Sequence, residues 1–113
     1  MDCLFCKIIK GEIPSNKVYE DEYVYAFRDI DPKAPTHVLI IPKKHIGSTN
    51  ELETEDTVLL GKVYEAVKKI AVTEGVDQSG YRVVSNTLSD GGQTVAHLHF
   101  HLLGGRSLTW PPG

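Results

Sequence analysis

The stretch QTVAHLHFHLLGGR, residues 93–106, alternates histidine with apolar side chains. It holds three of the chain's five histidines, His97, His99 and His101. Successive side chains of a β-strand point to opposite faces, so the three imidazoles would share one face of a strand. The other face would carry Ala96, Leu98, Phe100 and Leu102. We predict a strand over Val95–Leu103 that packs its apolar face on the core and turns its histidines toward a groove or solvent.

The spacing of the histidine row fits two kinds of chemistry. Neighbouring histidines would stand about 6.5–7 Å apart along the strand, which suits several contacts to one polyanionic substrate. Histidines at i and i+2 can also bind a single metal ion. An imidazole with a pKa near 6.5 is largely neutral at neutral pH and is then available as a nucleophile. The alternative is a polar strand face that happens to consist of histidine.

The segment SDGGQT directly before the strand supplies groups that suit a phosphate. Gly91 and Gly92 let backbone amides approach a ligand closely or form an anion-binding nest. Gln93 and Thr94 add neutral donors, and we expect Asn86, at the end of the preceding strand, to face the same site. The alternative for this segment is a plain hairpin turn.

The remaining sequence predicts an α+β domain spanning residues 1–113, with helices packed against an antiparallel sheet. Apolar residues recur with helical periodicity between Leu59 and Ala71, and Gly75 follows as a stop signal. The expected elements are a short helix over residues 3–10, strands over 17–20, 23–29 and 36–42, a long helix over 55–74, and strands over 81–86 and 95–103.

Composition and charge narrow the class of protein. The chain has 113 residues, of which 41% are hydrophobic and 24% charged, as in ordinary globular proteins. Its net charge is -3 and no run of Lys and Arg exceeds two residues, so we expect neither nucleic acid nor membrane as a partner. No apolar run approaches the roughly 18 residues of a membrane span, and the N-terminus lacks a secretory pattern, so we expect a cytoplasmic protein.

Cys3 and Cys6 are the only cysteines of the chain. A reducing cytoplasm disfavours a disulfide between them and leaves either free thiols or a metal site. At i and i+3 on the first helix they share a face and form half of a tetrahedral site, which needs two further ligands.

The motif HLHFHLL, residues 97–103, resembles the histidine-triad pattern in which three histidines alternate with apolar residues. Similarity extends through FCKIIKGEIPS, AFRDIDPKAPTHVLIIPKKHI, GYRVVSN, SDGGQTVAHLHFHLLGGR and WPPG. The chain is therefore similar to the histidine-triad (HIT) superfamily. The endings LLGGR and WPPG favour its nucleotide-binding (Hint) branch over the dinucleoside-polyphosphate hydrolase branch.

The resemblance implies a HIT-like fold, with a five-stranded antiparallel sheet, one long helix and one short helix. It also implies a homodimer in which two sheets join into one of ten strands. The implied partners are purine nucleoside monophosphates and phosphoramidates. The implied activity is hydrolysis of purine nucleoside 5′-phosphoramidates, such as AMP joined to an amine or to lysine, through a nucleotidyl-histidine intermediate and without a cofactor.

By the same resemblance, the catalytic residues are His99 as nucleophile with His97, His101 and Thr94 beside it. The implied nucleotide-binding residues are Phe27, Asp29, Ile30, Asn86, Gly92, Gln93, Thr94, His99, His101 and Trp110. Among these, Asp29 would grip the ribose hydroxyls, since a carboxylate accepts from both. Its alternative is a turn-forming acid, and ordinary core is the alternative for Phe27 and Ile30, which would sandwich the base. Trp110 would reach toward the partner subunit's site, and His37 is interpreted as structural.

The resemblance further suggests a structural zinc held by Cys3, Cys6, His45 and His97. The alternative is two buried free thiols and a surface histidine. Two other functions stay open: a nucleotide-binding regulatory module with residual hydrolase activity, and a metal-dependent hydrolase whose triad binds a catalytic ion. The last is disfavoured because we expect no acidic or histidine ligand set on the same face, apart from the cysteine pair.

Overall fold

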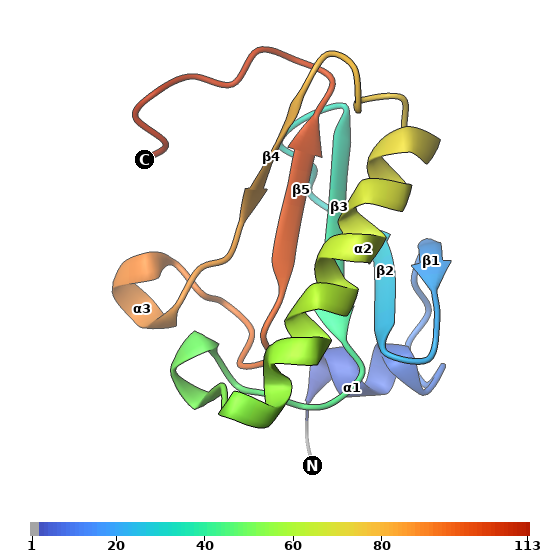
Figure 1. Cartoon of the computed structure of the whole chain (residues 1–113), viewed down its shortest axis with the longest axis vertical. Coiled ribbons are helices and arrows are strands. Elements are labelled where there is room, and N and C mark those ends of the chain that lie inside the picture. Colours follow the sequence, from blue (N-terminus) through green and yellow to red (C-terminus); the bar gives the residue numbers. More distant parts are fainter. Residues whose placement is uncertain (1–2) are drawn as a thin grey trace.

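The computed structural model describes residues 3–113 and places helices on both faces of one antiparallel sheet (Figure 1). The sheet has five strands in the order β1-β2-β3-β5-β4, which confirms the predicted α+β fold class. The elements are α1 (Leu4–Ile9), β1 (Lys17–Glu20), β2 (Val24–Arg28), β3 (Thr36–Pro42), the 3₁₀ turns η1 (Thr49–Glu51) and η2 (Thr54–Asp56), α2 (Thr57–Thr73), β4 (Tyr81–Val84), α3 (Leu88–Gly91) and β5 (Phe100–Gly104).

Strand β3 is the centre of the sheet and is buried along its whole length. Val38 and Ile40 belong to the hydrophobic cluster on the α2 side of the sheet. Leu39 and Ile41 belong to a second cluster, which α1 covers on the opposite side. A strand with both faces covered needs a continuous apolar run, which explains the sequence THVLIIP.

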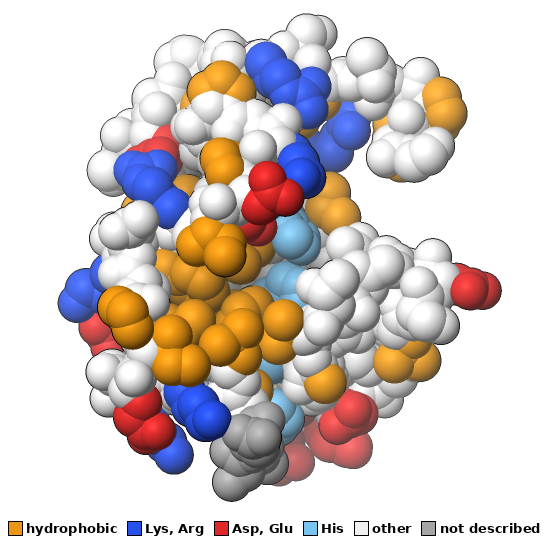
Figure 2. All heavy atoms as spheres, turned by 180° about the vertical axis from the view of Figure 1, so that it is seen from behind, with side chains coloured by type: hydrophobic (Ala, Val, Ile, Leu, Met, Phe, Trp, Pro, Cys, Tyr) orange, Lys and Arg blue, Asp and Glu red, His pale blue; other side chains and the backbone are white. Residues whose placement is uncertain are grey.

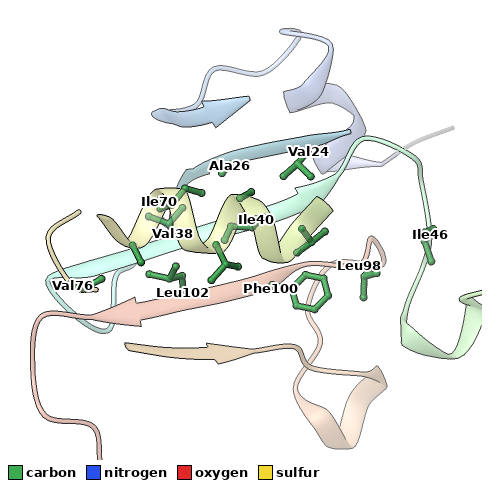
Figure 3. Close-up of a cluster of buried hydrophobic side chains, with 14 residues drawn as sticks. Val24, Ala26, Val38, Ile40, Ile46, Ile70, Val76, Leu98, Phe100 and Leu102 are labelled. Atoms are coloured by element: carbon green, nitrogen blue, oxygen red, sulfur yellow. The ribbon is translucent and has the colours of Figure 1, made fainter. Parts of the chain in front are cut away.

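Helix α2 packs its apolar stripe on the larger of the two clusters (Figure 3). Ile70 comes from α2, and Leu98, Phe100 and Leu102 come from the chain entering and forming β5. These three residues are 1%, 7% and 0% exposed and pack on the core as expected. Ala96, predicted on the same face, is exposed, because the chain has not yet joined the sheet there. Within residues 3–113, no helix is both long enough and apolar enough to cross a membrane.

Several elements begin or end elsewhere than the sequence predicts. The last strand begins at Phe100 rather than Val95, because the preceding residues leave the sheet. The amide of His97 donates to Val95 O at 2.9 Å, a tight turn, and that of Leu98 donates to Ile46 O at 2.6 Å. The neighbouring strand β3 has already ended at Pro42, so it offers no ladder here. Strand β4 ends at Val84, and the expected loop after it contains the helical turn α3.

Gly104 ends β5, and Gly105 directly after it packs against the loop that contains Pro35. Gly105 has a φ of +89°, and a Cβ placed there would lie 2.9 Å from Cβ of Pro35. Only glycine adopts this conformation without strain and leaves room for the proline.

We predict that Gly105→Ala lowers the free energy of unfolding by about 1–3 kcal/mol, because both the backbone angle and the proline contact oppose a side chain. Gly61→Ala is the matched control, since it lies inside α2 and an added Cβ there meets nothing within 4 Å. That control should gain roughly 0.5–1 kcal/mol from helix propensity. Urea unfolding of both variants measures the difference, and shifts of the same sign would contradict the prediction.

Candidate functional site

A cavity of about 590 Å³ lies on the face of the sheet opposite α2. Seen from behind the view of Figure 1, it is a hollow with histidine side chains along its floor (Figure 2). Its lining includes Asp29, His37, Asn86, Thr94, His101 and Arg106. Lys33 and Arg82 also reach it, so cationic and neutral donor groups face a space large enough for a mononucleotide-sized ligand.

His99 is held in one tautomer beside this cavity. It is not a lining residue, but its ring centroid lies 5.2 Å from that of His101, which is one. Its Nδ1 lies 2.7 Å from the carbonyl oxygen of His97, so Nδ1 carries the proton and donates it. Nε2 of His99 therefore has a free lone pair, and it makes no hydrogen bond to the described residues. Among residues 3–113, every fully buried side-chain nitrogen or oxygen has a hydrogen-bond partner. Because Nε2 of His99 has none, it is not fully buried, although the residue is only 4% exposed.

The orientation of His101 is set by a chain of hydrogen bonds through His37. The amide of Lys33 donates to Nδ1 of His37 at 3.1 Å, so the proton of His37 is on Nε2. That Nε2 lies 2.9 Å from Nδ1 of His101 and donates to it, which leaves His101 with its own proton on Nε2. His101 therefore presents a neutral donor, and His37, interpreted as structural from the sequence, is part of the site.

Burial keeps both of these imidazoles neutral. Burial, together with the smaller effects of nearby His99 and His37, lowers the pKa of His101 to about 4. Burial also lowers the pKa of His37, against the opposing effect of Asp29. At neutral pH the pair therefore retains the single tautomer that the backbone of Lys33 imposes.

Asp29 forms a turn and also faces the cavity. Its Oδ1 accepts from the amide of Asp31 at 2.8 Å, which is the turn-forming alternative. Its Oδ2 lies 3.4 Å from Nε2 of His37, and the side chain, 19% exposed, lines the cavity. The turn thus aims a carboxylate at the cavity rather than at bulk solvent.

Asp29, His37 and His101 form a cluster of potential ligand atoms, contrary to the expectation that no such set flanks the triad. The sequence could not show this because the three residues come from different segments around β2, β3 and β5. The hydrogen bonds nevertheless disfavour a metal there. Nε2 of His37 carries a proton, so it has no lone pair for an ion while Lys33 occupies Nδ1.

A second, smaller cavity of about 230 Å³ adjoins Phe27 and Ile30. Ile30 is 98% exposed, so the interpretation of this residue as ordinary core is wrong. Phe27 is 5% exposed and belongs to the cluster under α1, where its ring meets that of Phe5 at 5.5 Å. Phe27 is thus core residue and cavity wall at once.

The Gly-Gly segment before the triad is a helix end rather than a free anion nest. The amides of Gly92 and Gln93 donate to Ser89 O and Leu88 O, both at 3.0 Å, and close α3. The Gln93 side chain bonds the backbone of Leu88, Gly47 and Val95. Thr94 and Asn86 line the cavity, whereas Gly92 and Gln93 are not among its lining residues.

Cys3, Cys6, His45 and His97 form a compact cluster whose four ligand atoms all lie within 4.8 Å of one another. Cys3 Sγ is 3.4 Å and Cys6 Sγ is 3.6 Å from Nδ1 of His97. Nδ1 of His45 is 3.3 Å from Cys6 Sγ and 3.2 Å from Nδ1 of His97. Tetrahedral zinc requires edges of about 3.6 Å between S and N and about 3.3 Å between two N, so the donor set fits this ion.

The surroundings of His97 also match those of a metal ligand. Nε2 donates to the carbonyl of Pro42 at 2.9 Å, which leaves the Nδ1 lone pair directed at the cysteines. Burial lowers the pKa of His97, and burial together with Cys3 raises the pKa of the Cys6 thiol. His97 is 0% exposed, so the prediction that it faces a groove or solvent is wrong.

Trp110 in the C-terminal tail is 81% exposed and lines neither cavity, although Thr109 and Pro112 on either side of it line the larger one. Arg82 from β4 donates to the carbonyl of Thr109 at 2.8 Å and holds the start of this tail near the cavity. Within one chain the structure does not bring Trp110 to the triad.

Comparison with known proteins agrees with the fold. The HIT domain family model matches residues 10–108, and the chain therefore belongs to the HIT family. The purine nucleoside phosphoramidase of Escherichia coli strain K12 is 50% identical over 107 residues, which are 95% of this chain and 90% of that protein.

Two further relatives bear on the hydrolase class and on the cysteine cluster. A 14 kDa zinc-binding protein of Zea mays is 54% identical over 112 residues, covering 97% of this chain and 87% of that protein. The crystal structure of a HIT family hydrolase from Legionella pneumophila superimposes with a TM-score of 0.97 at 56% identity, covering 99% of this chain and 100% of that one.

We predict that stability falls as pH drops from about 6.5 toward 4, in part because of His101. Its folded pKa of about 4 lies below the unfolded value, so in this window the unfolded chain takes up a proton that the folded chain does not. His101→Asn should flatten the pH dependence by on the order of 2–3 kcal/mol across the window. Urea unfolding at several pH values measures this, and parallel curves for wild type and variant would refute it.

Proposed function

We propose that this HIT family hydrolase cleaves purine nucleoside 5′-phosphoramidates through a covalent nucleotidyl-histidine intermediate. The observation that carries the proposal is the fixed tautomer of His99, whose unprotonated Nε2 is accessible beside His101. A relative named purine nucleoside phosphoramidase, 50% identical over 107 residues, supports the same substrate class.

In the first step, Nε2 of His99 attacks the α-phosphorus and the bond from phosphorus to the substrate nitrogen breaks. The amine leaves with the electron pair of that bond and takes up a proton from solvent, to which the attacking water of the second step later releases one. The nucleotide stays on His99. The neutral Nε2–H of His101 donates to a phosphoryl oxygen, where negative charge grows. Nδ1 of His99 remains bonded to His97 O, which stabilises the positive charge that the ring acquires.

In the second step, water attacks the same phosphorus and the bond to His99 breaks, which releases the nucleoside monophosphate and restores the neutral ring. Splitting one displacement into two is the advantage of covalent catalysis. Asn86 and Thr94 line the cavity and are proposed to hold phosphate oxygens or the leaving group. We place Gly92 and Gln93 in supporting positions, because their amides close α3.

The nucleoside would lie between the two cavities. Asp29 stands at the larger one and is proposed to accept the ribose hydroxyls. Ile30 and Phe27 line the smaller one and are proposed to sandwich the purine. The full exposure of Ile30 is then useful, because a side chain without protein neighbours can cover a flat ring.

We further propose a homodimer. Strand β4 is an edge of the sheet, so its outer backbone groups are available to a second copy. Tyr64 and Val72 on α2 are 50% and 63% exposed, and Trp110 is 81% exposed. Pairing through β4 would build a ten-stranded sheet, cover these apolar side chains and bring the partner subunit's Trp110 to the site.

We propose that Cys3, Cys6, His45 and His97 hold a structural zinc. The ion would supply no reacting group, because its four positions are taken by protein and its ligands are largely buried. It would tie α1 to the chain after β3 and to the chain before β5.

Protein purified without added metal is expected to contain about one zinc per chain, measured by elemental analysis together with thiol counting. His45→Asn should lower the zinc content, because it removes one of the four donors. His101→Asn is the matched control and should keep the metal, because its ring belongs to the other histidine cluster. Intact thiols with zinc near zero in the wild type would refute the proposal.

The two other functions make different demands on the protein. A catalytic ion at the triad would make turnover depend on metal outside the cysteine cluster, so activity that persists in EDTA while that cluster stays loaded excludes it. A regulatory module with residual activity would bind purine nucleotide tightly and turn over slowly. The free Nε2 of His99 favours the enzyme, because nucleotide binding alone needs no unprotonated nucleophile.

Mixing the protein with a purine nucleoside phosphoramidate at low pH and quenching should trap a nucleotidyl adduct, seen by intact-protein mass spectrometry. His99→Asn removes the nucleophile and should form no adduct, with turnover reduced by at least about a thousandfold. Thr94→Ala is the control that keeps His99 and should still form the adduct. Full turnover by His99→Asn would show that another group attacks phosphorus.

A further inference from the structure

We propose that the cluster of Cys3, Cys6, His45 and His97 positions the nucleophile His99, through the carbonyl of His97 and through the ring of Phe5. The inference rests on the proposed function, since it takes His99 as the nucleophile. It assigns to this cluster a second role, in addition to joining α1 to the sheet.

The first link is the residue that both sites share. The ring of His97 is held on one side by the cluster, with Cys3 Sγ at 3.4 Å, and on the other by Pro42 O at 2.9 Å. Its backbone oxygen accepts from Nδ1 of His99 at 2.7 Å. His97 lies before the start of β5, so no strand ladder holds this carbonyl. The peptide that carries it is held by the amide of Leu98, which donates to Ile46 O at 2.6 Å, and by the anchored ring of His97.

The second link is Phe5, which lies between the two cysteines in sequence. Its ring meets His99 edge-on, with centroids 5.2 Å apart and planes at 88°, and meets His97 at 5.9 Å. Phe5 is 4% exposed and is carried by α1, a helix of only six residues. A helix this short is not stable alone, so its position depends on its contacts. These are the packing of Phe5 and Ile8 in the cluster that includes Phe27, and the two cysteines at its start.

The groups proposed to bind substrate are held independently. His37 lies on β3 and His101 on β5, and Leu39 pairs with His101 in the ladder between these strands. Asp29 is fixed by its own turn to Asp31. Loss of the cluster should therefore disturb the step in which His99 reacts and leave substrate binding largely unchanged.

The test compares wild-type protein as purified with Cys3→Ser and Phe5→Leu. Serine at position 3 keeps a side-chain oxygen to cap α1, as Cys3 Sγ does now for the amide of Cys6, but removes a thiolate ligand. Long-range ¹H–¹⁵N spectra of the histidine side chains report the tautomer of His99. Zinc content, kcat and KM for a nucleoside phosphoramidate are measured on the same samples.

Wild type should show His99 only as the Nδ1–H tautomer. Cys3→Ser should lose zinc, show a tautomer mixture at His99 and lose about tenfold in kcat with KM within about twofold, as expected for a misplaced catalytic group. Phe5→Leu should keep zinc and lose a few-fold in kcat. Val67→Ala, on the buried face of α2 in the other hydrophobic cluster, is the control for lowered stability and should keep both the tautomer and kcat.

A zinc-free Cys3→Ser protein with an unchanged His99 spectrum and wild-type kcat would overturn the proposal. Should that variant not fold, the same comparison is made on wild type before and after stripping its metal with a chelator. Failure of the proposed function looks different: wild type would form no adduct on His99. The spectra would still decide whether the cluster holds that ring.

Discussion

The strict alternation of the chain from Leu98 to Leu102 is the constraint on which the site depends. Leu98, Phe100 and Leu102 are buried in the cluster under α2, and their burial forces His99 and His101 to the other face. A shift by one residue would place imidazoles in the core and leucines in the cavity, at a cost of several kcal/mol for each unpaired buried polar group. Core packing thus fixes the face on which chemistry takes place.

Backbone groups then determine what each imidazole can do. The carbonyl of Pro42 accepts a hydrogen bond from Nε2–H of His97, and the carbonyl of His97 accepts one from Nδ1–H of His99. The amide of Lys33 donates to Nδ1 of His37, which places the proton of His37 on Nε2. That Nε2–H donates to Nδ1 of His101, so the proton of His101 is on Nε2 as well. Burial keeps His37, His97 and His101 neutral. In the proposed function, one residue type can therefore serve as ligand, nucleophile or donor according to the backbone group that faces it.

The sequence predicts the sheet well, because its strands are short apolar runs between turn residues, but it locates the ends of elements less well. The last strand begins late for reasons that lie elsewhere in the chain: β3 stops at Pro42, which leaves residues 95–97 without a partner, and the amide of Leu98 bonds to Ile46 O outside the ladder. The partnership of His37 with His101 spans 64 residues and follows from the register of β3 with β5. Likewise, a Gly-Gly pair looks the same whether its amides bind an anion or, as at Gly92, end a helical turn.

The three triad histidines are equivalent in the sequence pattern and differ in the fold by depth. His97 is 0% exposed, His99 is 4% exposed, and His101 lines the cavity. This order matches the proposed roles, because a structural metal site excludes water, a nucleophile needs access at one atom, and a phosphate donor needs an open face. This difference in exposure arises along the segment that leads from the cysteine cluster into β5. The position at which the last strand joins the sheet therefore separates the cysteine cluster from the cavity.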